Sequence, residues 1–410
     1  MTAYLFSGGR FLDPRAPELR EGVEVLVEGN RVREVSDRPI ATQSATRVDL
    51  RGRTLMPGLI DAHVHFFLAE VNIGLLDGMP LTLLTTKAAV AARRMLMRGF
   101  TTVRDAGGSD YGMKAAIEQG LVDGPRLFVS GMPISQTGGH ADFRKRTQTA
   151  FECSCCSGLA YLSRIADGVP EMLKAVRDEL RKGADQIKVM VSGGVASQSD
   201  PLESLQFRVD EIEAAVEQAT SWGTYVMAHA YSAAAIGRAV DCGVRTIEHG
   251  NLVDDAVARR MAERGAYMVP TLVTYECLQR RGPDYGLTPY SLQKNEIVLE
   301  AGLRSLELCR SAGVRIGFGT DLLGALQDEQ CREFLIRAEA MPPHEVIRSA
   351  TIVNAQIVQR EGDLGELVPG AYADLLVVDG DPFRDLGVLQ NQGERIAGIM
   401  KDGRWYKNLL

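Results

Sequence analysis

The stretch Met56-Pro57-Gly58-Leu59-Ile60-Asp61-Ala62-His63-Val64-His65 places an apolar run directly before two histidines that one residue separates. Side chains at positions i and i+2 of an extended strand point to the same face. His63 and His65 are therefore predicted to project together from the end of a strand that begins near Gly58. Two imidazoles on one face are typical of a metal site. The alternative is that two of the six histidines fall close together by chance and cap a buried strand.

Downstream of this stretch, short apolar strands alternate with amphipathic helices, which is the pattern of parallel βα units. Eight strands are predicted, at residues 58–65, 101–105, 126–130, 186–191, 224–229, 245–249, 267–272 and 315–321. Helices are predicted at residues 81–97, 169–181, 209–221, 232–242, 254–264 and 291–312. Eight alternating units indicate an α/β protein built on a (β/α)8 TIM barrel. A doubly wound open sheet is the alternative, but the first strand lacks the Gly-x-Gly-x-x-Gly turn of a dinucleotide site.

The two ends of the chain have a different texture. Residues 4–55 contain short alternating runs, such as Val23-Glu24-Val25-Leu26-Val27-Glu28, separated by glycine turn signals, and they predict a small antiparallel sheet. Similar runs return only at residues 373–379 and 396–404. We therefore predict a β-sandwich domain formed by residues 1–56 and 364–410, and a barrel domain formed by residues 57–363.

Composition limits the class of partner. The 410 residues carry a formal charge of −7, which argues against a general nucleic-acid binder. No apolar run approaches the roughly 18 residues that span a bilayer, and residues 1–10 lack the pattern of a secretory signal. We expect a cytoplasmic protein that acts on a small molecule, with neither nucleic acid nor a membrane as partner. The seven cysteines include Cys153, Cys155 and Cys156, and without a second pair at zinc-finger spacing we interpret all seven as reduced thiols, with this cluster in a mobile loop near the site.

Chemically active side chains gather at the ends of the predicted strands, where the active site of such a barrel lies. They are His63, His65, Lys188, His229, His249 and Asp321. Imidazole and carboxylate are good zinc ligands, and an open coordination position allows a bound water to be activated. A protonated lysine has no lone pair, but as a carbamate formed with carbon dioxide Lys188 becomes an anion able to bridge two metal ions about 3.5 to 4 Å apart. The plainer alternatives are a salt-bridged Lys188 and an Asp321 that caps a helix.

This set resembles the amidohydrolase superfamily, and the resemblance covers nearly the whole chain. The matching segments are residues 57–65, Lys188, His229, residues 247–250, 319–321 and 369–375. The resemblance implies two divalent metal ions, expected to be Zn2+, with carboxylated Lys188 bridging both. It assigns His63, His65 and Asp321 to the more buried ion, and His229 and His249 to the other. It also implies that Asp321 receives the proton of a bridging water that attacks the substrate carbonyl, and then passes this proton to the leaving nitrogen.

A finer resemblance bears on the substrate. Residues 188–197, 228–232 and 246–251 are similar to metal-dependent dipeptidases, namely prolidases that cleave Xaa-Pro and relatives that cleave Xaa-Arg or Xaa-Lys, and to enzymes that open the amide of ochratoxin A. This implies a dipeptide or N-acyl amino acid with a free α-carboxylate, and a homo-oligomer. Tyr231 becomes a candidate donor to the oxyanion of the tetrahedral intermediate. His140 becomes a candidate ligand of the substrate carbonyl or carboxylate.

Three functions stay open on the sequence. The first is a binuclear zinc peptidase or amidohydrolase that favours proline or a hydrophobic C-terminal residue. The second is a hydrolase of a cyclic amide, lactone or imidazolone, or a deaminase, because the same metal rim serves these reactions. The third is a non-catalytic assembly protein, which predicts missing ligands, whereas all six positions are filled. Arg104 and Arg144 are candidates to bind the substrate carboxylate, residues 192–195 are expected to shape the pocket, and His344 is expected to be an unrelated surface residue.

Overall fold

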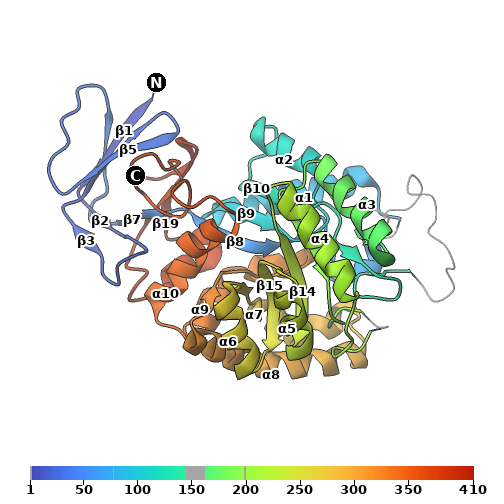
Figure 1. Cartoon of the computed structure of the whole chain (residues 1–410). Coiled ribbons are helices and arrows are strands. Elements are labelled where there is room, and N and C mark those ends of the chain that lie inside the picture. The colour runs from blue at the N-terminus through green and yellow to red at the C-terminus, as the bar shows by residue number, and fades with distance from the viewer. Residues whose placement is uncertain (1, 77, 145–161, 198–199) are drawn as a thin grey trace.

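The computed structural model describes residues 2–76, 78–144, 162–197 and 200–410, so the predicted loop of Cys153, Cys155 and Cys156 lies outside the described residues. Helices and parallel strands alternate through the middle of the chain, and both termini lie at one end of the molecule (Figure 1). The α/β class predicted from the alternating pattern is confirmed.

Two parallel sheets form the centre of the structure. The first has the order β10-β9-β8, and the second has the order β12-β11-β13-β14-β15-β16-β17. Their bounds are β8 (Leu59–Val64), β9 (Phe100–Asp105), β10 (Arg126–Val129), β11 (Ile134–Ser135), β12 (Arg164–Ile165), β13 (Ile187–Met190), β14 (Val226–Ser232), β15 (Thr246–Leu252), β16 (Tyr267–Val269) and β17 (Arg315–Ile316). Each of the eight predicted strands is present at least in part, and β11 and β12 are additions that the pattern did not indicate.

Backbone hydrogen bonds connect the first sheet to the second on either side of it. On one side, the amide of Ala62 donates to the carbonyl of Phe318 (2.8 Å), and the amide of Asp321 donates to the carbonyl of His63 (2.8 Å). On the other side, the amide of Asp185 donates to the carbonyl of Val129 (2.7 Å). The carboxyl ends of the first and last strands are thereby held together, although β17 itself ends at Ile316.

The described α-helices are α1 (Leu81–Met97), α2 (Tyr111–Glu118), α3 (Gly168–Arg181), α4 (Val209–Ser221), α5 (Ala233–Asp241), α6 (Asp255–Arg264), α7 (Leu272–Arg281), α8 (Pro289–Ala312), α9 (Arg332–Arg337), α10 (Pro343–Arg348) and α11 (Asn354–Ile357). Six of them, α1, α3, α4, α5, α6 and α8, follow the predicted amphipathic segments closely, whereas α2, α7, α9, α10 and α11 were not predicted. The ends of α8 illustrate the local chemistry, because Thr288 caps its first turn through the amide of Ser291 and Gly313 follows its last turn in the left-handed region (φ +83°).

Two strands are several residues shorter than predicted. The apolar run at 267–272 was interpreted as one strand, but β16 stops at Val269 and Leu272 already begins α7. Pro270 has no amide hydrogen for a ladder, and the first half of α7 is buried almost all round, so it lacks the polar stripe by which a helix is detected. The run at 315–321 leaves the ladder after Ile316, and Asp321 has a left-handed backbone (φ +52°).

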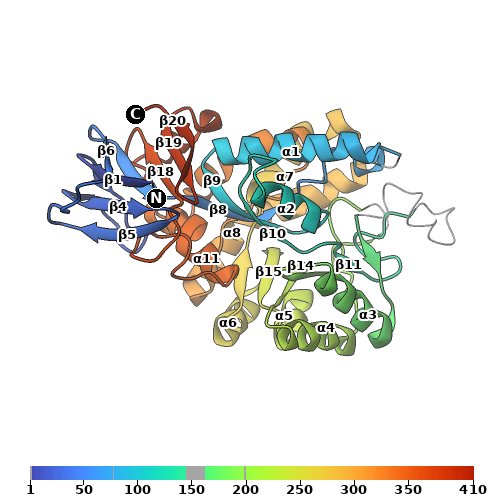
Figure 2. The same ribbon diagram turned by 90° about the horizontal axis from the view of Figure 1, so that it is seen from above.

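The terminal segments form two further sheets, of which the second contains strands from both ends of the chain. Their orders are β5-β4-β1-β6 and β20-β19-β18-β7-β2-β3. The strands are β1 (Ala3–Ser7), β2 (Arg10–Phe11), β3 (Arg20–Glu21), β4 (Glu24–Glu28), β5 (Arg31–Ser36), β6 (Thr46–Asp49), β7 (Thr54–Pro57), β18 (Leu375–Val378), β19 (Ile396–Lys401) and β20 (Arg404–Asn408). Antiparallel pairing of β7 with β18 joins the two ends, which lie side by side in Figure 2. One buried apolar cluster, which includes Phe6, Val25, Leu55, Leu375 and Met400, draws on both sheets.

The prediction of a purely antiparallel N-terminal sheet was wrong. The strands β1, β4 and β5 are antiparallel, but β6 pairs with β1 in parallel, and β2 pairs with β7 in parallel. The connection of residues 37–45 carries β6 to the edge opposite β5, and this placement replaces the hairpin that the alternating pattern suggested.

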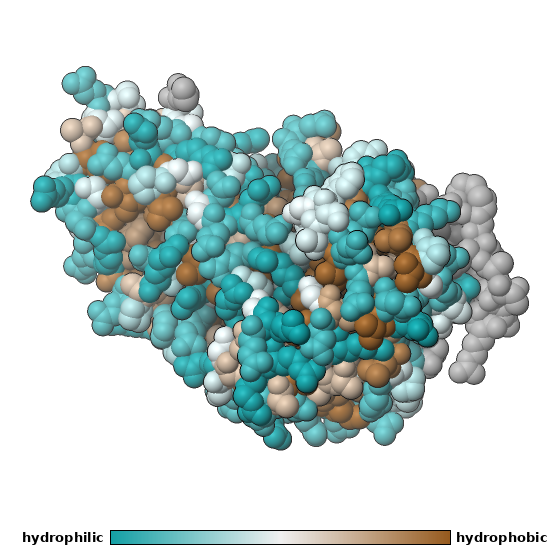
Figure 3. All heavy atoms as spheres, in the orientation of Figure 1, coloured by the Kyte–Doolittle hydropathy of each residue, from teal (hydrophilic) through white to brown (hydrophobic). Residues whose placement is uncertain are grey.

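The surface of the molecule is largely hydrophilic on the face drawn in Figure 3, with hydrophobic side chains in small groups over the terminal sheets and over the helical part of the molecule. Among the described helices, none combines the length and the apolar character that crossing a membrane requires.

Candidate active site

All eight residues predicted for the site line one cavity at the carboxyl ends of the parallel strands. They are His63, His65, His140, Lys188, His229, Tyr231, His249 and Asp321. The six predicted metal ligands come from β8, β13, β14, β15 and the segment after β17. The structure therefore brings together side chains that are up to 258 positions apart in the sequence, and their roles remain predictions.

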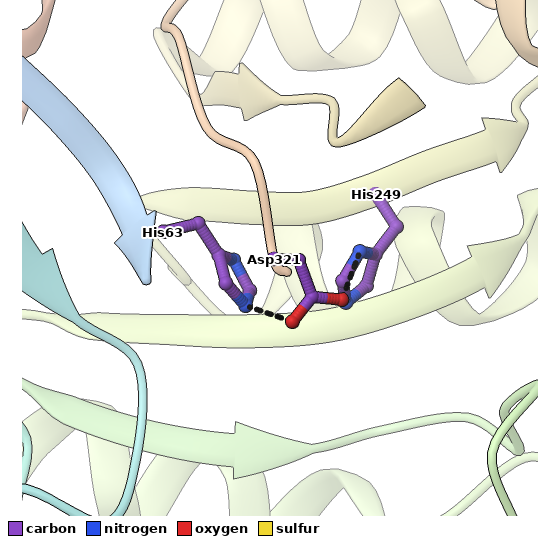
Figure 4. Close-up of side chains that lie close together, drawn as sticks. All are labelled: His63, His249 and Asp321. Carbon is purple, nitrogen blue, oxygen red and sulfur yellow. Dashed lines mark ion pairs between the residues drawn. The ribbon is translucent and has the colours of Figure 1, made fainter. Parts of the chain in front are cut away.

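The carboxylate of Asp321 lies between histidines from two strands. Its Oδ1 atom is 3.1 Å from Nε2 of His65 and 3.5 Å from Nε2 of His63, and its Oδ2 atom is 3.9 Å from Nδ1 of His249. Figure 4 shows the carboxylate between the rings of His63 and His249. Because His63, His249 and Asp321 place ligand atoms within 4.8 Å of one another, this group can hold a metal ion.

Each of the four histidines uses one ring nitrogen for a protein contact. The contacts are His63 Nδ1 to Glu248 Oε2 (2.7 Å), His65 Nδ1 to the carbonyl of Gly107 (2.9 Å), His229 Nε2 to the carbonyl of Gly193 (3.1 Å) and His249 Nδ1 to Thr271 Oγ1 (2.9 Å). Carbonyl and carboxylate oxygens only accept, and a hydroxyl oxygen can accept, so these nitrogens carry the hydrogen of a neutral imidazole. The other nitrogen of each ring can bind a metal, and in His63 and His65 this nitrogen faces the carboxylate of Asp321.

Glu248 and Arg104 form an ion pair that contacts His63 through Glu248. Both side chains are fully buried, and Nη2 of Arg104 contacts the two carboxylate oxygens of Glu248 at 2.8 and 3.0 Å. Nε of Arg104 also donates to the carbonyl of Ala62 (2.6 Å). Arg104 is thus committed to a buried ion pair and does not line the cavity, so the structure does not support it as a ligand of the substrate carboxylate.

His249 and Asp321 have left-handed backbones, with φ of +74° and +52°. This backbone conformation is unfavourable for residues other than glycine, and it persists where surrounding contacts impose it. In β15, the left-handed backbone of His249 interrupts the alternation of side chains along the strand. Glu248 contacts His63, and the next residue, His249, lines the cavity. No pattern of residue types in the sequence indicates such a reversal.

The charges of the site suit a divalent cation. Burial lowers the pKa of His63, His229 and His249 well below the ordinary value, so these rings are neutral donors. Burial alone raises the pKa of Asp321, but the neighbouring His63, His65 and Lys188 hold it below its ordinary value. Burial also acts to lower the pKa of His65, but the hydrogen bond and the charge of Asp321 raise it above the ordinary value. Imidazoles and one carboxylate are the donor types that zinc prefers, so this set of side chains fits zinc chemistry.

Lys188 is also suited to the chemistry predicted for it. Its side chain is 2% exposed, and burial lowers its pKa to about 8, while the carboxylates of Glu248 and Asp321 act in the opposite direction. The neutral amine is the form that reacts with carbon dioxide. A carbamate at this position adds the anionic charge that two divalent ions need.

The sequence and the fold are both similar to those of known proteins. Residues 54–406 match the amidohydrolase family. The chain belongs to this family. It is 31% identical over 388 residues to ochratoxinase of Aspergillus niger, an alignment that covers 90% of this chain and 78% of that protein. The crystal structure of an amidohydrolase, 54% identical, has a TM-score of 0.96 and matches over 99% of both chains. The crystal structure of a prolidase complexed with N-methylphosphonate-L-proline, 48% identical, also has a TM-score of 0.96 and covers 99% of this chain and 100% of that chain.

The protein is therefore an amidohydrolase of the dipeptidase-like branch and hydrolyses amide or peptide bonds. This confirms the resemblance and the enzyme class predicted from the sequence. It also removes the support for a non-catalytic assembly protein, since all six predicted ligand positions of this amidohydrolase line the cavity.

His140 lines the cavity beside His229. Its ring stacks on that of His229, with centroids 4.3 Å apart and planes 12° apart, and its Nδ1 is 3.2 Å from Oδ2 of Asp200. An added Cβ at Gly194 would lie 2.2 Å from Cε1 of His140, so only glycine fits beneath the ring. The Gly193-Gly194 pair thus shapes the site by close backbone approach, as predicted for residues 192–195.

Sequence reasoning missed the groups that hold this loop. The ammonium group of Lys294, on α8, is buried and donates to the carbonyls of Gly194, Ser197 and Asp200, the last at 3.1 Å. The carboxylate of Asp200 in turn accepts from the amide of Gly194 (2.9 Å). A single lysine within a long helix carries no sequence signal for this role.

The rest of the cavity wall is apolar. It includes Leu68, Ile73, Phe143, Leu162, Val195, Leu278 and Leu323. Among the described lining residues there is no arginine, and Asp321 is the sole carboxylate. Arg144, the other candidate to bind the substrate carboxylate, contacts Asp142 through its Nε (2.7 Å) and does not line the cavity, and neither does His344, on α10. Cys242, Cys277, Cys309 and Cys331 are free and buried, as predicted.

Proposed function

We propose that this amidohydrolase is prolidase-like and cleaves Xaa-Pro dipeptides or N-acyl amino acids whose released amino acid is proline or hydrophobic. The observation that carries the proposal is the cavity itself, in which predicted metal ligands face an apolar wall. The similarity to a prolidase at 48% identity supports the same substrate class.

Two divalent metal ions, with Zn2+ as the expected metal, complete the proposed site. His63, His65 and Asp321 would hold one ion, His229 and His249 the other, and carboxylated Lys188 would bridge both. When bound, the ions supply Lewis-acid chemistry, which polarises a carbonyl and makes a water molecule more acidic. The free ring nitrogens and the low pKa of Asp321 support this assignment.

Three side chains have the remaining roles in the proposed reaction. The carboxylate of Asp321 accepts a proton from the attacking water and returns it to the leaving nitrogen, as general base and then general acid. The hydroxyl of Tyr231 donates a hydrogen bond to the oxygen on which negative charge develops. Nε2 of His140, the nitrogen that does not face Asp200, binds the substrate carbonyl or carboxylate.

The wall of the pocket separates the candidate substrates. A cationic side chain of an Xaa-Arg or Xaa-Lys dipeptide needs a carboxylate partner once it is buried. The described wall offers only Asp321, which is surrounded by histidines, so we place these dipeptides below hydrophobic substrates. Hydrolysis of ochratoxin A is the second candidate activity, and the 31% identity to ochratoxinase favours it over a cyclic amide hydrolase or a deaminase.

We propose the same architecture that the sequence predicts: a closed (β/α)8 barrel with a β-sandwich domain built by both termini, residues 1–56 and 364–410. The hydrogen bonds from Ala62 to Phe318 and from Asp185 to Val129 support closure. The shared apolar cluster between the two terminal sheets supports the sandwich.

The test is a panel of substrates with zinc-loaded protein. L-Xaa-L-Pro, L-Xaa-L-Arg and N-acetyl amino acids are assayed together with ochratoxin A, and Lys188→Ala serves as the control for metal-dependent turnover. Preferred release of proline or a hydrophobic amino acid is expected. Preferred release of arginine, or silence across the panel with metal bound, would contradict the proposal.

A further inference from the structure

Three hydroxyl groups form a hydrogen-bonded network at the wall of the cavity, which Tyr231 and Tyr275 both line. It runs from Nδ1 of His249 to Oγ1 of Thr271 (2.9 Å), from there to the hydroxyl of Tyr275 (3.2 Å), and on to the hydroxyl of Tyr231 (2.9 Å). These four side chains are all at most 3% exposed. Within the part of the chain that the structure describes, the three hydroxyls have no other hydrogen-bond partner.

The chain links three neighbouring strands at their carboxyl ends. Tyr231 comes from β14 and His249 from β15, while Thr271 follows β16 at the start of α7. Tyr275 stands one helical turn after Thr271, so the two side chains share a face of α7. The ring of Tyr231 also stacks on that of His249, with centroids 5.2 Å apart and planes 21° apart. The ring of Tyr231 also packs edge-on against His229 and Tyr275, while its hydroxyl has the single contact with Tyr275.

The direction of these hydrogen bonds follows from one end. If Nε2 of His249 holds a metal, the hydrogen of the neutral ring is on Nδ1, which donates to Thr271. The hydrogen of Thr271 is then available to Tyr275, and that of Tyr275 to Tyr231. A tyrosine is protonated at neutral pH and has one hydrogen, so Tyr231, once it accepts from Tyr275, has its own hydrogen left for the cavity.

We infer that Thr271 and Tyr275 are positioning residues that direct the hydroxyl hydrogen of Tyr231 into the cavity, towards the oxygen of the reacting carbonyl. This inference rests on the proposed function, in which Tyr231 is the donor to that oxygen. Without Thr271, the hydroxyl of Tyr275 can accept the hydrogen of Tyr231, and without Tyr275 no donor fixes the direction of that hydrogen, so in both cases the donor is partly lost to the substrate. Neither residue needs to touch the substrate for this role.

A double-mutant cycle separates this role from packing. Tyr231→Phe, Tyr275→Phe and the double variant are compared for kcat and KM on an L-Xaa-L-Pro substrate, for the dissociation constant of N-methylphosphonate-L-proline, and for metal content. Tyr231→Phe is expected to lower kcat by about 100-fold, the effect of losing one oxyanion donor. Tyr275→Phe is expected to lower kcat by about tenfold with metal content and KM little changed. In the Tyr231→Phe background, Tyr275→Phe is expected to have no further effect on kcat or on phosphonate binding.

Thr271 provides a second arm. Thr271→Ser keeps the hydroxyl and is expected to retain activity, whereas Thr271→Val breaks the chain and is expected to lower both kcat and the metal content, because Nδ1 of His249 loses its acceptor. An equal loss from Tyr275→Phe with and without Tyr231 would overturn the inference while leaving the proposed function standing. A wild-type protein that neither turns over the dipeptide nor binds the phosphonate would overturn both.

Discussion

Nδ1 of His63 lies 2.7 Å from Oε2 of Glu248, and both side chains are buried. The carboxylate is paired with Arg104, whose guanidinium contacts both of its oxygens. An anionic carboxylate only accepts hydrogen bonds, so it fixes the hydrogen of His63 on Nδ1 and leaves Nε2 free beside Asp321. The ion pair of Glu248 with Arg104 thereby determines which ring nitrogen of His63, a predicted metal ligand, carries the hydrogen.

Glu248→Gln tests this relationship. The amide group can present a donor to Nδ1 of His63, and the metal affinity of the site is expected to fall by about 10 to 100-fold. Equilibrium dialysis of zinc against a competing chelator measures the change. Glu345→Gln is the matched control, because Glu345 pairs with Arg310 at the protein surface. Equal zinc affinity in the two variants would show that Glu248 does not set the state of His63.

Gly194→Ala tests the placement of His140. The added Cβ would lie 2.2 Å from the ring of His140, so the ring must move. Displacement of a substrate-binding group by about 1 Å is expected to lower kcat/KM by about 100-fold, with the metal content preserved. Gly237→Ala is the control, since its Cβ would have only contacts of 3.4 Å or longer on α5. Unchanged kcat/KM in Gly194→Ala would remove His140 from the proposed site.

Lys294→Met tests the buried ammonium group. Its loss removes a donor to the backbone carbonyls of Gly194, Ser197 and Asp200, and the free energy of unfolding is expected to fall by about 1 to 3 kcal/mol. Urea denaturation measures the loss. Lys174→Met, at an exposed position of α3, is expected to change the unfolding free energy by less than about 0.5 kcal/mol. Equal stability of the two variants would mean that Lys294 does not hold this segment.

Leu68→Asp tests the specificity of the apolar wall. Leu68 lines the cavity at a partly exposed position, so a carboxylate there keeps some contact with water. The ratio of kcat/KM for L-Xaa-L-Arg to that for L-Xaa-L-Leu is expected to rise by about tenfold, because one favourable charge pair is worth about that factor. Leu68→Asn has nearly the same shape without the charge. A similar change of the ratio in both variants would attribute the effect to shape.

Much of the architecture could be predicted because it depends on local periodicity. The helices α1 and α4 begin and end at the predicted residues, and the period of two in β8 placed His63 and His65 on one side of the cavity. The position of the other predicted ligands at the cavity followed from a single rule, that active groups gather at the carboxyl ends of parallel strands.

The remainder depends on contacts that no local pattern contains. Glu248 contacts His63 across 185 positions of sequence, and Lys294 contacts Gly194 across 100. The left-handed backbone of His249 is imposed by its surroundings, and Thr271 belongs to a segment in which a strand, a proline and a buried helix form one apolar run. The parallel pairing of β6 with β1 depends on where a long connection leads.

The most direct test of the proposed function is the zinc content and turnover of Lys188→Ala beside the wild type, each prepared with zinc and bicarbonate. Wild-type protein is expected to bind two zinc ions per chain and to hydrolyse an L-Xaa-L-Pro substrate. Lys188→Ala lacks the bridging carbamate and is expected to bind at most one zinc ion and to lose turnover by at least about 1,000-fold. Two tightly bound zinc ions and undiminished turnover in Lys188→Ala would contradict the account.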